Sequence, residues 1–524
     1  MCSTRRAAAA LAALLLAPAV LAAQERGAFV ITMRGDTLAV ERFTRAPGSL
    51  SAEVVLRGAG RLAWTAALAP DASVTGMEFR GYAQTAAADA PPAQTAKVEL
   101  SGDSARVTVE GGGNRMVQAL APGRGAIPVL SFSLLLVEQV LLRARALGGD
   151  GAAVPVFVVG LPNALVARVA WRGDSAVVDL PSGAVHARVD AAGRLLGARV
   201  PAQNLEVSRT AELALAPSRP DYSAPADAPY TAEEVRVPTP GGFRLAGTLT
   251  LPKERRGRVP VVVTISGSGQ QDRDATPLTL PGYRFFRQVA DTLGRRGIGV
   301  LRFDDRGHGE SEGDLTDVTS ADFAADVRAV VAYLRSRPEV DPERIALLGH
   351  SEGGVIAPLV AADDPRVAAV VLVAGTSRRG EEIIEYQRRW AAEHDSTVPP
   401  ERRDSAVAAY RAQADSTVGR LAWWKWFMEH DPLPVARRLR QPVLVLHGAA
   451  DRQVTADQAQ ELAAAIRRSG NGDVTVRVFP GVDHLLVRDP VGDPARYDRL
   501  PSMRVVPEFL GALADWLAAK LRYP

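Results

Sequence analysis

The sequence predicts an α/β fold for residues 233–524, with a mostly parallel, doubly wound sheet and a helical cap insertion, preceded by an antiparallel β-rich domain in residues 24–215. Two observations support this division. Strand-like apolar runs alternate with helical patterns in the C-terminal part, which is typical of a parallel sheet covered on both faces. Short alternating runs separated by glycine fill the N-terminal part. At 524 residues the chain exceeds one ordinary core, so we expect more than one domain.

The N-terminal part carries the chemistry of β-hairpins. Gly-Asp pairs begin at positions 35, 102 and 173, and each precedes a run with strand-like alternation. Residues 132–146 instead space their apolar side chains as a helix does. These patterns predict a meander or open barrel that one helix interrupts. His186 is the only histidine in this part and fits a strand surface better than a ligand, so we interpret the region as an accessory domain.

Two segments flank this β-rich part. Residues 1–23 have the pattern of a signal peptide, because two arginines precede an alanine-rich apolar stretch and small residues at Ala22 and Ala23 suit a cleavage site. The pattern predicts an exported protein, periplasmic or secreted, without stable membrane insertion. Residues 216–232 contain four prolines and no apolar period, which predicts a linker.

The C-terminal part alternates between two kinds of pattern. Strands are expected at Glu234–Val237, Phe243–Leu251, Val259–Ile265, Gly299–Phe303, Ile345–Leu348, Val367–Val373, Val443–Leu446 and Val474–Phe479. Helices are expected at Tyr283–Arg296, Ser320–Arg335, Asp457–Arg468 and Val505–Leu521. In such sheets the reactive groups collect at the carboxyl ends of the strands.

One insertion interrupts the alternation. Residues 378–440 favour helices and are interpreted as a cap over the active site. Four of the seven tryptophans fall here: Trp390, Trp423, Trp424 and Trp426. Their rings could line an acyl pocket or simply hold the cap helices together, and the sequence leaves both interpretations open.

A strand, an abrupt turn and a helix are expected within residues 345–359, with Ser351 at the apex. Gly349 and Gly353 flank this serine at the spacing of a nucleophile elbow. Side chains at the flanking positions would collide with neighbouring elements. The same spacing recurs around Ser311, but the strand before it ends too early and no helix follows. Ser351 is therefore the predicted nucleophile.

A serine hydroxyl needs a base to accept its proton and an acid to orient that base. Asp451 and His484 each follow a buried strand, and the chain order Ser, Asp, His is that of one lineage of triad enzymes. They are the predicted acid and base. Asp483 would point away from its neighbour, and Asp457 would already lie on the next helix. His308 is a minority alternative for the base.

The transition state of acyl transfer develops an oxyanion that needs preorganised donors. The backbone N–H groups of Glu352 and Ser268 are the predicted donors, and Gly267 or Gly269 could replace Ser268. His350 is expected to face away from the nucleophile.

Several other features are interpreted as structural or indicate an absence. His447 is expected to have a structural role at a strand end. The charged loop 302–311 is interpreted as a structural brace of Asp–Arg pairs. No histidine pair, carboxylate cluster or nucleotide loop stands out, so we expect no metal and no cofactor.

Residues 235–524 resemble the α/β-hydrolases, most closely the bacterial EstD-type serine carboxylesterases near the serine-aminopeptidase-like branch. The motifs that carry the resemblance are ISGSGQQDRD from Ile265, DDRGHGES from Asp304, GHSEGG from Gly349, HGAAD from His447 and Asp483-His484. The resemblance implies a carboxylesterase for short or medium acyl chains, without a cofactor. It also implies Ser351 as nucleophile, Asp451 as orienting acid and His484 as base. Ser266 stands where many relatives have histidine.

The sequence thus predicts an exported serine hydrolase that cleaves carboxylic esters of short to medium acyl chains. The alternatives are a serine peptidase acting on short peptides and a binding protein on a catalytically dead hydrolase scaffold. The expected partner is a small-molecule ester. Nucleic acid is excluded because 62 basic residues face 59 acidic ones without a basic cluster. Nothing in the sequence indicates an oligomeric state.

Overall fold

The structure is a computed structural model that describes residues 24–521, except for 34, 58–59, 83–89, 112–113, 160–163, 181–182, 215–219, 256, 278–279, 281, 316 and 420. The predicted signal peptide, residues 1–23, lies outside the described residues, as does part of the predicted linker. Within the described residues no helix has the length and apolar character needed to cross a bilayer.

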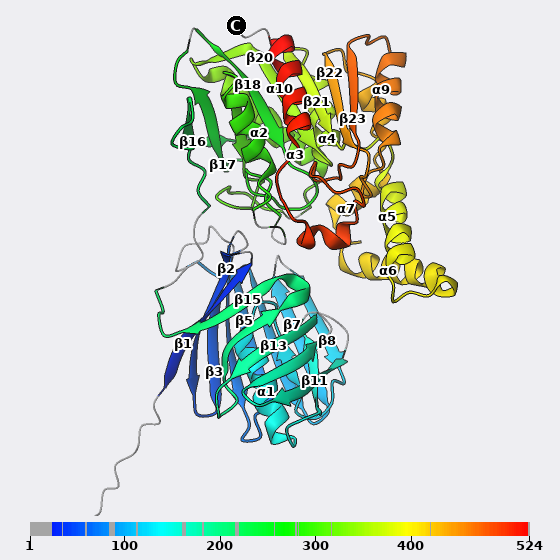
Figure 1. Cartoon of the computed structure of the whole chain (residues 1–524). Coiled ribbons are helices and arrows are strands. Elements are labelled where there is room, and N and C mark those ends of the chain that lie inside the picture. The colour runs from blue at the N-terminus through cyan, green and yellow to red at the C-terminus, as the bar shows by residue number, and fades with distance from the viewer. Residues whose placement is uncertain are drawn as a thin grey trace, which may run out of the picture.

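The N-terminal domain is built on one sheet of 15 strands within the described residues (Figure 1). Its first half contains β1 (Glu25–Met33), β2 (Asp36–Ala46), β3 (Ser49–Leu56), β4 (Gly60–Leu68), β5 (Val74–Tyr82), β6 (Gln94–Ser101), β7 (Ser104–Gly111) and β8 (Asn114–Leu120). Its second half contains β9 (Ile127–Val129), β10 (Ala152–Val158), β11 (Ala164–Arg172), β12 (Ser175–Leu180), β13 (Gly183–Val189), β14 (Leu195–Val200) and β15 (Leu205–Thr210).

The two halves are antiparallel meanders that meet where β1 pairs with β15. Only β9, at one edge, runs parallel to its neighbour β10. Helix α1 (Leu134–Ala146) packs against strands of both halves and lies in the curve of the sheet (Figure 1). Alternating burial along strands such as β7 and β11 leaves one face for this core and one for solvent.

Helix α1 is anchored by a buried acid from the sheet. The Glu41 carboxylate accepts hydrogen bonds from the backbone N–H groups of Leu134 and Leu135, at 2.6 and 2.9 Å. The first N–H groups of a helix have no partner within the helix, so Glu41 supplies the acceptor that they lack. Burial raises the pKa of Glu41 to about 7. The apolar spacing predicted this helix from residue 132, but Phe132 has a left-handed φ of 62°, so the helix begins at Leu134.

The C-terminal domain has a sheet of 8 strands within the described residues, in the order β16-β17-β19-β18-β20-β21-β22-β23. These strands are β16 (Tyr230–Pro238), β17 (Arg244–Pro252), β18 (Val259–Ile265), β19 (Gly299–Phe303), β20 (Val340–His350), β21 (Val367–Val373), β22 (Val443–Gly448) and β23 (Val474–Phe479). The strands from β18 to β23 are parallel, and β16 and β17 form an antiparallel edge. The predicted fold class is confirmed.

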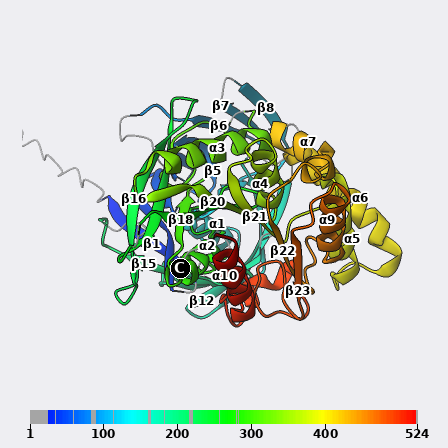
Figure 2. The ribbon, with the colours of Figure 1, turned by 90° about the horizontal axis from the view of Figure 1, so that it is seen from above.

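Helices cover both faces of this sheet (Figure 2). They are α2 (Phe285–Gly294), α3 (Ser320–Ser336), α4 (Gly353–Ala361), α9 (Asp457–Arg468) and α10 (Pro507–Leu521). One apolar core joins α3, α4 and α9 to the sheet, and a second joins α2 and α10 to its other face. Central strands such as β18 are buried along their whole length, which explains their unbroken apolar sequence.

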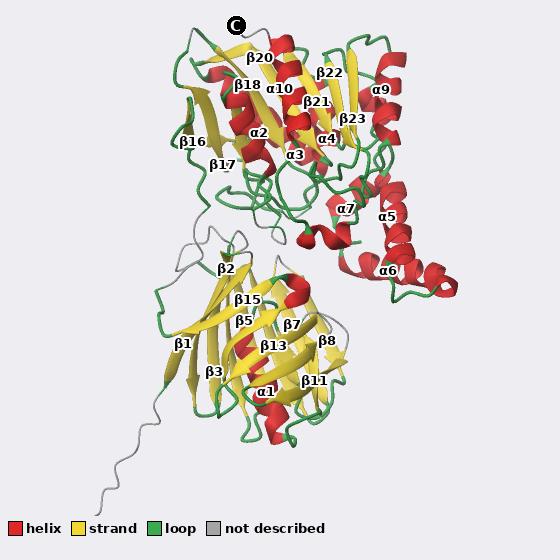
Figure 3. Ribbon diagram, in the orientation of Figure 1, coloured by secondary structure: helices red, strands yellow, loops and turns green. Residues whose placement is uncertain are grey.

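The segment between β21 and β22 folds into helices that project from the sheet (Figure 3). These are α5 (Gly380–His394), α6 (Arg403–Thr417), α7 (Ala422–Glu429) and α8 (Leu433–Ala436). Short 3-10 turns occur at η1 (Pro201–Gln203), η2 (Pro400–Arg402) and η3 (Pro494–Arg499).

The predicted linker, 216–232, extends too far toward the C-terminus. Residues 230–232 already belong to β16, where Tyr230 pairs with Pro252. Tyr230 is buried and its hydroxyl donates a 2.8 Å hydrogen bond to Asp291 on α2. The proline-rich composition hid this strand start because the tyrosine directly follows Pro229.

Candidate active site

Ser351 lies in the turn between β20 and α4. Its φ is 55°, in the left-handed region that side chains other than glycine rarely adopt. Its N–H donates to the carbonyl of Val373 at 2.9 Å, which ties the turn to the neighbouring strand β21. A Cβ on Gly349 would lie 1.9 Å from the carbonyl oxygen of Gly353, and a Cβ on Gly353 would lie 2.3 Å from that of Ile265. Glycine is therefore required on both sides of the serine.

Asp451 and His484 come from the loops after β22 and β23. Nδ1 of His484 lies 2.7 Å from Oδ2 of Asp451. Oδ1 of Asp451 accepts backbone N–H groups from Gln453 at 2.8 Å and Val454 at 2.9 Å. Because these contacts hold both carboxylate oxygens, the aspartate fixes the plane of the imidazole.

A second histidine shares this carboxylate. Nε2 of His447, in the fully buried strand β22, lies 3.2 Å from Oδ2 of Asp451 and 2.8 Å from the carbonyl oxygen of Val454. With two acceptors nearby, Nε2 carries the proton and donates. The structural role expected for His447 thus includes a contact with the predicted catalytic acid, which sequence reasoning missed.

The charges of this pair support each other. Burial alone would lower the pKa of His484, but the Asp451 carboxylate outweighs burial and holds that pKa above the ordinary histidine value. Burial alone would raise the pKa of Asp451, but the charge of His484 and the hydrogen bonds from both histidines hold it well below the usual range. Asp451 is therefore ionised at neutral pH.

His350 was expected to face away from the nucleophile, but it contributes to the same site. Its Nε2 donates a 3.0 Å hydrogen bond to the backbone carbonyl of His484, and the two rings lie 5.0 Å apart. Its ring also packs against Phe285. Burial and the nearby His484 lower the pKa of His350 to about 3, so the ring stays neutral. The expectation missed this role because the partner lies 134 residues further along the chain.

The predicted oxyanion donors lie beside the serine. Ser268 and Glu352 line one cavity together with Ser351 and His484. The backbone N–H groups of Ser268 and Glu352 donate no hydrogen bond to another residue in the described part of the chain. Gly267 comes close as well, since a Cβ there would lie 3.0 Å from Cβ of Ser351. Gly267 therefore stays open as an alternative donor.

The side chain of Glu352 has a role that sequence reasoning missed. Its Oε1 accepts a 2.6 Å hydrogen bond from the Ser320 hydroxyl at the start of α3. It also accepts a 2.8 Å hydrogen bond from the indole N–H of Trp423 on the cap helix α7. The residue after the serine therefore fastens the cap to the turn.

The cavity around the serine measures about 460 Å³. Two of the cap tryptophans, Trp423 and Trp424, line it. The other two instead stack on histidines four residues further along the chain, Trp390 on His394 and Trp426 on His430. Trp423 and Trp424 therefore border the cavity of Ser351, whereas the ring stacks of Trp390 and Trp426 are local contacts.

The competing candidates occupy other places. Ser311 is fully buried, where its hydroxyl accepts the N–H of Ala246 at 2.9 Å and donates to the carbonyl of Asp304 at 2.7 Å. Oδ1 of Asp483 accepts two backbone N–H groups of its own loop. Burial raises the pKa of Asp483 to about 7. Asp457 is paired with Arg378 on the protein surface.

The charged loop after β19 forms the expected brace. Arg273 pairs with Asp304 at 2.8 Å, and Arg306 binds Asp326 with two contacts of 2.6 Å. His308 in this loop is not among the described residues that line the cavity of Ser351. Within the part of the chain that the structure describes, no three His, Cys, Asp or Glu side chains form a group suited to a metal ion.

Comparison with known proteins identifies the family of the C-terminal domain. The sequence model of the serine aminopeptidase family S33 matches residues 282–491. Mouse monoglyceride lipase is 31% identical over 214 residues, which cover 37% of this chain and 69% of the lipase. The chain belongs to the α/β-hydrolase superfamily and to its serine-hydrolase branch of esterases and peptidases.

Two further proteins are similar to part of this chain. Esterase EstD of Thermotoga maritima is 29% identical over 273 residues. The aligned part covers 51% of this chain and 62% of EstD, so the chain spans less than two thirds of that relative. The solved structure of the Pyrococcus furiosus esterase PF2001 aligns with a TM-score of 0.42 at 19% identity, over 58% of this chain and 96% of that one.

Proposed function

We propose that this protein is an exported carboxylic ester hydrolase that uses Ser351, His484 and Asp451 as its catalytic triad. One observation carries the proposal: a serine in the strained turn after β20 and a histidine bonded to a buried aspartate line the same cavity. A strained serine beside an oriented imidazole is the arrangement that nucleophilic acyl transfer requires. The likeness to EstD, which is named an esterase, supports the choice of ester.

The reaction runs through an acyl-enzyme. Because Nδ1 of His484 is held by Asp451, Nε2 is the ring nitrogen that accepts the proton of Ser351 as its oxygen attacks the ester carbonyl. The N–H groups of Glu352 and Ser268 stabilise the oxyanion. His484 then returns the proton to the departing alcohol, and a water activated by the same imidazole releases the acid. Asp451 stabilises the imidazolium in both steps.

The cavity favours an ester over a peptide with a free amine. An aminopeptidase needs a carboxylate that holds the substrate ammonium group. Among the described residues that line the cavity, Glu352 is the only acid, and its Oε1 is already bonded to Ser320 and Trp423. Glu385 on the cap binds Arg411 and Arg389 instead of facing this cavity.

Labelling and turnover test the proposal together. A fluorophosphonate probe should label the wild type and the Ser311→Ala variant, and it should not label Ser351→Ala. The same three proteins should be assayed on p-nitrophenyl esters and on aminoacyl nitroanilides. We expect ester turnover to exceed amide turnover in the wild type. The reverse order would establish a peptidase, and an unlabelled, inactive wild type would favour a binding protein on a dead scaffold.

Export is part of the proposal and has its own test. The proposal rests on the charged, apolar and small-residue order of residues 1–23. Expression of the full chain in a Gram-negative host, followed by fractionation and intact mass measurement, should give a periplasmic product that begins near Gln24. A cytoplasmic product of full mass would contradict export.

A further inference from the structure

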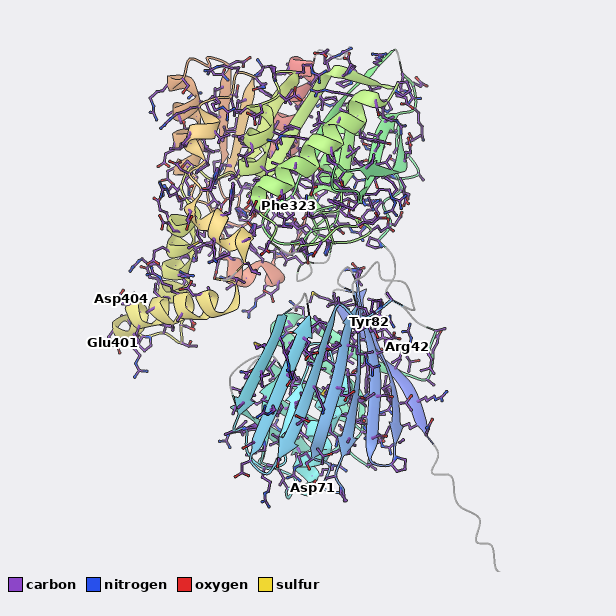
Figure 4. The ribbon with its side chains drawn as sticks, turned by 180° about the vertical axis from the view of Figure 1, so that it is seen from behind. Arg42, Asp71, Tyr82, Phe323, Glu401 and Asp404 are labelled. Carbon is purple, nitrogen blue, oxygen red and sulfur yellow. The ribbon has the colours of Figure 1, made fainter. Side chains whose placement is uncertain are left out.

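A second cavity lies next to the active site and has no role in the chemistry described above. It measures about 700 Å³ and opens between the ends of β18 and β19, the starts of α3 and α4, and the cap helix α7. Its apolar lining includes Phe303, Val318, Phe323, Val327, Ile356 and Leu421. Figure 4 shows Phe323 at the end of α3 that lies near the cap helices. The volume is within the range of ligand pockets.

The two cavities share a boundary. Gly267, Gln270, Glu352 and Trp423 line both of them. Two of these residues belong to the loop of the predicted oxyanion donors, and Glu352 directly follows the serine. The hydrogen bond from Trp423 to Glu352 fixes the cap on this boundary. The second cavity therefore adjoins the site of bond cleavage along this shared wall.

The charged groups of the second cavity are engaged with one another or exposed. Arg306 and Asp326 bind each other with two 2.6 Å contacts. Asp305 accepts the Ser266 hydroxyl at 2.6 Å and the N–H of Gln271 at 2.9 Å, and burial raises its pKa to about 8. Asp314 and Asp317 are exposed. The remaining inner surface is apolar and suits an apolar ligand.

The chemistry of the triad decides which half of an ester this cavity can take. The departing oxygen must receive its proton from His484, so the alcohol lies on the side of that histidine. His484 lines the first cavity and is not among the residues that line the second. The other substituent of the carbonyl extends away from the leaving group. The second cavity adjoins the site and is not lined by His484, so it is available to that substituent.

We propose that the second cavity binds the acyl group of the substrate and that this group is a long or bulky apolar acid. The inference rests on the proposed function, and it favours larger acids than the short to medium chains that the sequence predicts. Chains of only a few carbons would leave most of 700 Å³ unfilled. Each methylene that enters should raise kcat/KM by at most roughly fourfold, because full burial of one CH₂ is worth about 0.8 kcal/mol.

The test varies the acyl and alcohol parts of the substrate separately. We would measure kcat/KM for p-nitrophenyl acetate, butyrate, octanoate and laurate, and for acetates of ethanol, butanol and octanol. The variants are Val318→Trp and Leu421→Trp, which fill the cavity from two elements. Leu421 is 51% exposed, so its replacement leaves the core intact. Val478→Trp, on the exposed edge strand β23, is the matched control.

The expected results are specific. The wild type should prefer laurate to butyrate by about tenfold or more, and both filling variants should reduce this ratio at least about tenfold, while Val478→Trp keeps it. An unchanged acyl ratio in both variants would overturn the assignment, as would a loss confined to the alcohol series. A wild type that hydrolyses no ester would instead refute the proposed function. Circular dichroism verifies that each variant is folded.

Discussion

Nε2 of His447 lies 3.2 Å from Oδ2 of Asp451, the same oxygen that bonds His484 at 2.7 Å. All three side chains are buried. One carboxylate oxygen of Asp451 therefore contacts two imidazoles. The imidazole of His484 lines the cavity of Ser351, and that of His447 does not. Under the proposed mechanism His447 is a positioning residue, because it would act on the reaction through the aspartate.

Replacement of His447 should change both the rate and the pH profile. In His447→Leu, Asp451 loses one donor, so its charge acts more strongly on His484 and raises the pKa of that imidazole further. We expect kcat to fall roughly tenfold, in line with one hydrogen bond to a charged group, and the acidic limb of kcat/KM to move to higher pH. His447→Gln, which keeps a donor, should recover much of the rate. A rate loss without any shift of the limb would argue for a purely structural role.

Replacement of Asp451 should move the pH profile in the opposite direction. Catalysis needs neutral His484, so kcat/KM falls as the pH drops through the pKa of that histidine, which Asp451 holds above its ordinary value. In Asp451→Asn the lowering effect of burial on the pKa of His484 is opposed only by the weaker effect of the Asp483 charge, so the acidic limb should shift to lower pH. The rate should also fall about 10³- to 10⁴-fold, because the imidazole loses its orientation. Activity within tenfold of the wild type would exclude Asp451 as the orienting acid.

Replacement of Ser311 tests which of the two GxSxG segments, Gly309–Gly313 or Gly349–Gly353, contains the nucleophile. Ser311→Ala removes a buried hydroxyl that bridges Ala246 and Asp304. Because both backbone partners then lack a hydrogen bond, we expect the free energy of unfolding to fall by about 1–3 kcal/mol. Urea denaturation measures this loss, and labelling by fluorophosphonate should persist. Disappearance of the label in a folded Ser311→Ala protein would contradict the assignment of Ser351.

Replacement of Trp423 tests the link between the cap and the serine turn. Trp423→Phe keeps an aromatic ring but removes the donor to Glu352. We expect KM for p-nitrophenyl octanoate to rise roughly tenfold, since a hydrogen bond to a carboxylate is lost, with a smaller change in kcat. Trp426→Phe is the matched control, because its ring stacks on His430 and does not line either cavity. Equal effects of the two variants would show that the link has no special role.

Replacement of Glu41 tests a pH dependence of stability. Because burial raises its folded pKa to about 7, the contribution of protonated Glu41 is complete below the unfolded pKa of about 4.5 and is lost as the pH rises through 7. The loss amounts to about 3 kcal/mol. Glu41→Gln can keep the bonds to α1 without ionising, so its stability should change less between pH 5 and pH 8. Chemical denaturation at both pH values measures this, and equal pH dependence in both proteins would refute it.

The sequence predicted the central sheet well. The strands at Val259–Ile265, Gly299–Phe303, Val367–Val373 and Val474–Phe479 have the predicted boundaries. Short, mostly apolar runs with glycine or proline near their ends indicate strands of a parallel sheet, and burial of the central ones leaves little freedom in register. The turn of Ser351 could also be predicted from the sequence. The glycines at Gly349 and Gly353 are required because a side chain at either position would clash with the backbone.

Contacts that depend on the path of the chain could not be predicted. His350 binds a carbonyl 134 residues away, and Glu352 binds an indole 71 residues away. Neither partner has a fixed spacing that a pattern could reveal. The second cavity is hidden for the same reason, since its lining comes from strand ends, two helices and a cap helix that are distant in sequence. The residue types and their spacing in the sequence indicate what chemistry the site can perform. The size of the site depends on how distant elements pack, which the sequence pattern does not reveal.

The pairing of β1 with β15 joins Ala28 to Thr210 and Met33 to Leu205. During translation, the first strand must therefore wait for a partner that is made at the opposite end of the domain. At ribosomal rates of about 5–20 residues per second, this delay lasts roughly ten to forty seconds. Throughout that interval one edge of β1 is an unpaired template for other strands. The two halves of the sheet can therefore join along β1 only after residue 210 has been synthesised.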